Sequence, residues 1–81
     1  MDTRIALIGI IVENLDSAEK INDILHQYSD YIIGRMGLPH KEKNISIMSI
    51  ILDADNDVIS SLSGKIGMLP DVSCKTVYAT K

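Results

Sequence analysis

Long apolar runs alternate along this chain with segments of mixed polarity, and two of the runs are apolar at nearly every position. Residues 4–12 and 45–52 are rich in β-branched side chains, which favours strands buried on both faces over helices. Two further strands are predicted over residues 30–38 and 72–79, where polar and apolar side chains are more evenly mixed.

Two segments between these runs have apolar side chains at helical spacing. The first helix is predicted to begin at Asp16, which forms a variant of the capping box with Glu19, and to end near Tyr28 or Ser29. The second follows an aspartate-rich segment and is expected to be capped at its end by Gly67. The side chains predicted to face the sheet are Ala18, Ile21, Ile24, Leu25 and Tyr28 in the first helix and Val58, Ile59, Leu62 and Ile66 in the second.

The order of these elements is strand, helix, strand, strand, helix, strand, which predicts an α+β, ferredoxin-like βαββαβ sandwich. Right-handed crossovers place both helices on one face of a four-stranded antiparallel sheet. The most apolar strands, residues 4–12 and 45–52, are expected at its centre, and residues 38–44 are expected to form a hairpin loop. A length of 81 residues predicts a single domain, 1–81.

The two central strands are apolar on both of their faces, although the helices cover only one. In the first strand, one face presents Ile5, Leu7 and Ile11, and the other presents Ala6, Ile8, Ile10 and Val12. Soluble monomers rarely expose a contiguous apolar patch of this kind, and so small a domain is only marginally stable alone. We therefore expect a homo-oligomer, a dimer or a tetramer, joined through the helix-free sheet face.

Composition narrows the class of protein further. The chain has no Phe or Trp, but 46% of its residues are hydrophobic, and this high content excludes a disordered chain. Its single cysteine cannot form an internal disulfide. A net charge of −3 with no basic stripe argues against direct nucleic-acid binding. No apolar run is long enough to span a membrane, and no signal peptide is recognised, so a cytoplasmic protein is expected.

Groups that could carry catalysis or bind a metal are scattered. His26 and His40 fall in different elements, and Cys74 lies in an alternating strand, where a cysteine is usually a small buried residue. Residues 53–57 resemble the start of a calcium loop, but the required glycine and glutamate are replaced by Val58 and Gly64. We expect a protein that is not an enzyme and holds no metal or cofactor.

The segment around Arg35 is the most informative for binding. Gly34 and Gly37 are unusual in a strand and indicate a bulge or a close approach of another backbone. Arginine gives planar, bidentate recognition of carboxylate or phosphate. Arg35 therefore either contacts a ligand or pairs with a carboxylate of a neighbouring subunit.

Three motifs carry a resemblance to a known family. The sequences IGIIVE (residues 8–13), IGRMGLP (residues 33–39) and SGKIG (residues 63–67) resemble the iron-only hydrogenase system regulator family. Its members are similar to the ACT domain and to the C-terminal domain of the nickel-responsive repressor, ferredoxin-like folds that oligomerise and bind small effectors between subunits. The resemblance implies a regulatory, ligand-sensing module that binds a small effector or a partner protein.

The same resemblance places the ligand near the end of the first strand and the turn into the first helix. The expected ligand-binding residues are Gly9, Ile11, Glu13, Asn14, Arg35, Met36, Gly37 and His40. Two alternatives stay open at this point. One is a metal-binding sensor in which His40 acts with groups of another subunit, although the spacing of the histidines and the cysteine does not match the metal site of the nickel-responsive relative. The other is a structural protein that pairs by strand addition at the edge of its sheet.

Overall fold

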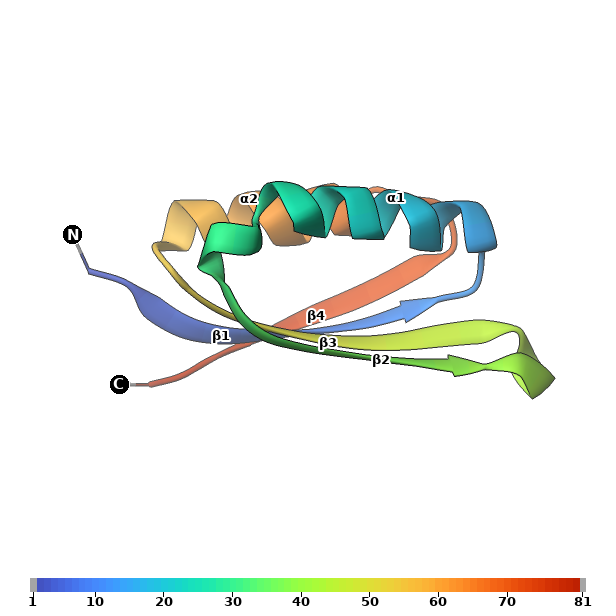
Figure 1. The fold of residues 1–81 in the computed structure, drawn as a ribbon. Helices are drawn as coiled ribbons and strands as arrows, with labels where there is room; N and C mark the ends of the chain where they lie inside the picture. Colours follow the sequence, from blue (N-terminus) through green and yellow to red (C-terminus); the bar gives the residue numbers. More distant parts are fainter. Residues whose placement is uncertain (1, 81) are drawn as a thin grey trace.

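Four strands and two helices follow one another in the predicted order (Figure 1). The computed structural model describes residues 2–80. The strands are β1 (Arg4–Val12), β2 (Ile32–His40), β3 (Ile45–Ala54) and β4 (Val72–Tyr78), and the helices are α1 (Leu15–Gln27) and α2 (Asn56–Gly67). Two short 3₁₀ turns, Ser29–Tyr31 and Lys41–Lys43, lie on either side of β2.

The strands form one antiparallel sheet in the order β2-β3-β1-β4. Both helices cover the same face of this sheet, and the opposite face carries no helix (Figure 1). The two most apolar strands, β1 and β3, are therefore central. This arrangement confirms the predicted α+β, ferredoxin-like sandwich.

The core lies between the helices and the sheet. The β1–β3 register places Ile8 beside Ile50 and Ile10 beside Met48 on the helix-covered face. Full burial of each such side chain stabilises the fold by about 1.5–3 kcal/mol. The buried apolar residues are Ala6, Ile8, Ile10, Val12, Ile21, Leu25, Met48, Ile50, Leu52, Ala54, Ile59, Leu62 and Ile66.

The cap of helix α1 lies two residues earlier than predicted, and the predicted capping box of Asp16 and Glu19 is wrong. Asn14 is the cap: its Oδ1 accepts hydrogen bonds from the backbone N–H of Asp16 at 2.9 Å and of Ser17 at 3.2 Å. Asn14 has the extended backbone that a cap requires, because the chain turns into the helix directly after β1. Asp16 consequently falls in the first helical turn.

Helix α2 is capped at its start by Asp55, whose Oδ1 accepts from the backbone N–H of Val58 at 2.9 Å. Gly67 is the last helical residue and not the predicted cap; the capping position is Met68, with right-handed backbone angles. The left-handed residue of this connection is Asp71, with φ of 58°. The reversal into β4 therefore occurs beyond Pro70, so no glycine is needed at the helix end.

Strand β2 lies two residues further along the chain than predicted, because residues 29–31 form a 3₁₀ turn. The expected bulge is present, since the pairing of β2 with β3 shifts between Ile32 and Gly34. Pro39, expected in a loop, lies within β2, where an edge strand tolerates its missing N–H. The hairpin connection is shorter than predicted and closes through Asn44, with φ of 58°.

Candidate functional site

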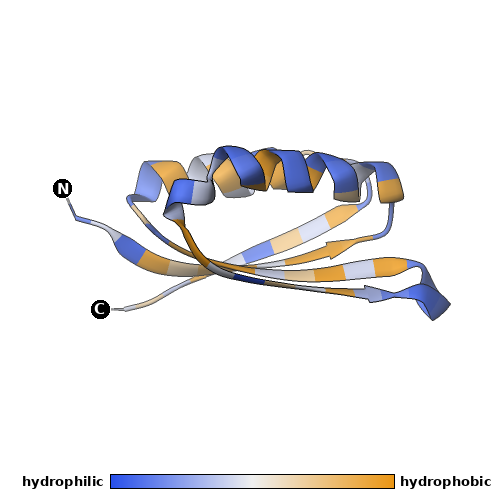
Figure 2. Cartoon of the chain, in the orientation of Figure 1, coloured by the Kyte–Doolittle hydropathy of each residue, from blue (hydrophilic) through white to orange (hydrophobic). Residues whose placement is uncertain are grey.

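Apolar side chains continue across the sheet face that carries no helix, and Figure 2 shows hydrophobic positions along the strands. In the register, Leu7 lies between Ile51 of β3 and Val77 of β4. On the edge strand β2, Met36 is 68% exposed and lies opposite Ser49. We call this surface the open face; the strand registers place on it the large apolar residues Ile5, Leu7, Ile11, Met36, Leu38, Ile45, Ile47, Ile51 and Val77.

A shallow hollow of about 340 Å³ lies at the middle of the open face. Gly9 forms its floor, because it has no side chain and is paired with Ser49 on one side and Lys75 on the other. The larger side chains of Ile11 and Ile47 border the hollow. The open face is thus an apolar surface with a depression, a shape suited to receiving a protruding apolar side chain.

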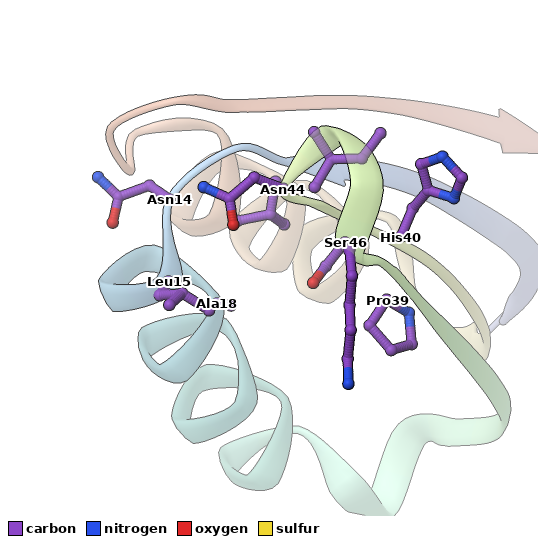
Figure 3. Close-up of a pocket in the computed structure, with 10 residues that line it drawn as sticks. Asn14, Leu15, Ala18, Pro39, His40, Asn44 and Ser46 are labelled. Carbon is purple, nitrogen blue, oxygen red and sulfur yellow. The ribbon is translucent and has the colours of Figure 1, made fainter.

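A second, smaller cavity of about 180 Å³ lies on the helix-covered side, between the start of α1 and the tip of the β2–β3 hairpin (Figure 3). We call it the hairpin pocket. Its lining residues are Val12, Asn14, Leu15, Ala18, Pro39, His40, Lys41, Asn44, Ile45 and Ser46.

The polar groups of the hairpin pocket differ in how they are already bonded. Asn14 is engaged at both ends of its amide, since its Oδ1 caps α1 and its Nδ2 donates to Asp71 Oδ2 at 3.3 Å. Pro39 and Ser46 are paired across the hairpin, and Figure 3 shows both on the side that faces α1. The His40 ring points the other way, so His40 lines the pocket without directing its imidazole at α1 (Figure 3).

The structure divides the predicted ligand-binding residues between these two surfaces. Asn14 and His40 line the hairpin pocket, whereas Gly9 and Ile11 border the hollow of the open face. Met36 lies on the open face beside Ser49. The predicted residues therefore do not meet in one cavity.

The remaining three predicted residues lie outside both cavities. Arg35 points to the helix side, where its Nη2 donates to Asn22 Oδ1 of α1 at 2.8 Å. Gly37 is paired with Met48, and a Cβ added there would meet nothing within 4 Å. Glu13 is exposed, and its backbone N–H bonds to the carbonyl of Asp71 at 2.9 Å. Arg35 thus has a partner within its own chain, and its contact with a ligand or a neighbouring subunit stays a prediction.

Sequence reasoning missed much of the hairpin pocket. Leu15 belongs to α1, whereas Lys41, Asn44 and Ser46 belong to the β2–β3 hairpin, and only folding brings the two segments together. One signal was present: Leu15 is a large apolar residue beside the predicted helix start, off the predicted apolar stripe. It is 75% exposed, so it contributes little to the core.

Potential metal ligands are not gathered anywhere in residues 2–80: no group of three or more His, Cys, Asp or Glu side chains could hold an ion there. Cys74 is half-buried on the helix-covered side, with its Sγ 3.6 Å from the carbonyl of Ser63. His26 is exposed in the last turn of α1.

None of the helices within residues 2–80 has the length and apolar character needed to cross a membrane.

A shifted pKa is found at Tyr28, which lies away from both cavities. The pKa of the Tyr28 phenol lies below its usual 10.0, first because of its interaction with the Lys65 side chain and then because of the hydrogen bond with Ser61. The Lys65 ammonium lies 5.0 Å from the ring centroid. This cluster joins the end of α1 to α2 and is a contact between helices.

The fold and the helix-free apolar face define a small α+β domain of the ferredoxin-like class. Residues 4–76 match the TM1266-like family, which is described as "Iron-only hydrogenase system regulator, putative", and the chain belongs to this family. No curated protein matches the sequence.

Solved structures agree with this assignment. The uncharacterized protein TM1266 from Thermotoga maritima is 35% identical, with a TM-score of 0.93 over 98% of this chain and 100% of its own. The C-terminal domain of the MgtC protein from Mycobacterium tuberculosis is 12% identical, with a TM-score of 0.70 over 94% of this chain and 87% of its own. A formyltetrahydrofolate deformylase from Pseudomonas syringae pv. tomato is 10% identical, with a TM-score of 0.65 over 100% of this chain and 29% of its own. The last two share the fold alone.

Proposed function

We propose that this chain is a homo-oligomeric regulatory module that binds a small effector and whose subunits join through the open face. The family to which it belongs is described as a regulator, which favours sensing over catalysis. The observation that carries the proposal is the open face itself, where large apolar side chains lie uncovered on both central strands and on both edges. Ile11, for example, is 43% exposed on a central strand.

The magnitude of the apolar contact supports a partner. Removing a few hundred Å² of apolar surface from water contributes on the order of 10 kcal/mol, at about 25 cal/mol per Å², before the cost of association. The core within residues 2–80 has thirteen buried apolar residues and is small enough for that amount to decide the stability of the fold. A second copy is the occupant that fits best, because a two-fold contact buries the same patch on both subunits.

Sedimentation velocity tests the proposed association. The subunit mass is 8.9 kDa, so a dimer or tetramer is readily distinguished from a monomer at micromolar concentration. Met36→Lys places a charge on the open face and is expected to shift the chain to monomers. Because Met36 is 68% exposed, the substitution disturbs no core contact within one chain, and circular dichroism measures whether the variant stays folded.

A matched control uses the same change elsewhere. Met68 is 86% exposed after the end of α2 and lies outside the open face, so Met68→Lys is expected to keep the wild-type mass. A wild-type chain that sediments as a folded monomer contradicts the proposal. So does a Met36→Lys chain that associates as tightly as the control.

A further inference from the structure

The hairpin pocket has a one-sided charge. Lys41 contributes a positive charge to its lining, and none of the ten lining residues is an aspartate or glutamate. Within residues 2–80, no side-chain hydrogen bond engages Lys41, Asn44 or Ser46. A cation, an amide and a hydroxyl thus border one cavity with their bonding capacity unused. These are groups that receive a carboxylate well.

The start of α1 does not supply a positive partner for an anion in the hairpin pocket. The Asn14 side chain already accepts hydrogen bonds from the backbone N–H groups of Asp16 and Ser17. An anion in the pocket therefore depends on Lys41 for its charge and on Ser46 and Asn44 for its hydrogen bonds. This dependence makes Lys41 the residue whose removal is most informative.

The opposite wall of the pocket is apolar. Leu15 and Ala18 on α1 face Pro39 of the hairpin, with Val12 buried behind them. Leu15 is 75% exposed, which the core does not explain but a ligand packed on it would. The cavity of about 180 Å³ has room for a small organic molecule. A molecule with an anionic head and a short apolar tail matches its two kinds of lining.

We propose that the hairpin pocket binds a small aliphatic monocarboxylate, with the carboxylate at Lys41, Asn44 and Ser46 and the tail against Leu15 and Ala18. The inference rests on the proposed function, because it names the chemical class of the effector. It places that effector on the helix-covered side of the sheet. Effector binding and association through the open face therefore use opposite sides of the sheet.

Nuclear magnetic resonance titration of the full chain tests this site with butyrate as the probe. We expect the backbone amide signals of Leu15, Ala18 and Ser46 to shift together, with a dissociation constant on the order of 1 mM. Butylamine, of similar length and opposite charge, is expected to leave them unchanged. Inorganic phosphate separates an organic ligand from a simple anion, because it offers charge without a tail and is expected to bind at least about fivefold more weakly.

Two variants assign the contacts. Lys41→Gln is expected to weaken butyrate binding about tenfold, as the loss of one charge-assisted hydrogen bond predicts. Lys43→Gln, on the same turn but outside the pocket lining, is its matched control and is expected to bind as the wild type does. Leu15→Ala removes an exposed side chain and is expected to weaken binding about fivefold without loss of folding.

Several results would overturn the proposal: no shift with butyrate, equal shifts with butylamine or phosphate, shifts confined to the open face, or equal effects of the two lysine variants. The association test is independent of these outcomes. A chain that oligomerises but does not bind butyrate refutes the effector class alone. A monomer that binds butyrate refutes the open-face contact alone.

Discussion

Asn14 stands at the junction of β1 and α1, and its side chain makes three hydrogen bonds there. Its Oδ1 accepts from the backbone N–H groups of Asp16 and Ser17, and its Nδ2 reaches Asp71. A further hydrogen bond joins the first turn of α1 to the same region: the buried Ser17 donates from Oγ to the carbonyl of Pro70 at 2.7 Å. The helix start is thereby fastened to the connection between α2 and β4.

Asn14→Ala is expected to lower the free energy of unfolding by about 1–2 kcal/mol, because it leaves helical N–H groups without their acceptor and removes the bond to Asp71. Chemical denaturation measures the change. Asp16→Ala is the comparison. Asp16 lies in the first turn, and its side chain makes no hydrogen bond within residues 2–80, so the loss of its favourable interaction with the helix dipole is expected to cost a few tenths of a kcal/mol. The reverse ranking of the two variants would identify Asp16 as the cap.

At the scale of elements, the order of strands and helices could be predicted because it depends on local periodicity. The helix face of Ile59, Leu62 and Ile66 is buried as the spacing requires. The helix caps were harder to predict than the order of the elements, since the role of Asn14 depends on where β1 ends in space. The hairpin pocket was harder still to predict from the sequence, because Leu15 and Ser46 are brought together only by the packing of α1 beside the hairpin.

Helix α2 contains a glycine in its interior, Gly64, that no neighbouring atom requires. Gly64 lies inside the helix, is exposed, and would place an added Cβ where nothing lies within 4 Å. Gly64→Ala is therefore expected to raise the free energy of unfolding by about 1 kcal/mol, since alanine loses less backbone entropy on folding. Thermal denaturation measures it, with Gly37→Ala as the comparison. Gly37 is also unobstructed but lies in a strand, where alanine brings no helical gain, and equal stabilisation of both variants would contradict this reason.

The whole molecule is a thin, two-layer body, with Cα extents of 42 × 19 × 17 Å. One layer of helices protects one side of the sheet, and the apolar pattern of β1 and β3 makes the other side suited to a second protein surface. Arg35 is not part of the open face, because its side chain lies on the helix side, where it donates to Asn22. Its pairing with a carboxylate of a neighbouring subunit stays a prediction. The expectation of association therefore rests on the open face.

If association through the open face stabilises the fold, the melting temperature must depend on protein concentration. Each tenfold increase in concentration favours an associated native state by about 1.4 kcal/mol per mole of dimer. For a chain of this length, that amount corresponds to a rise of roughly 3–5 °C in the melting temperature. Calorimetry over two decades of concentration measures it. Met36→Lys is expected to melt at one temperature throughout, whereas Met68→Lys is expected to follow the wild type. A wild-type melting temperature independent of concentration, together with a monomer mass, would mean that the helix and sheet layers of one chain suffice.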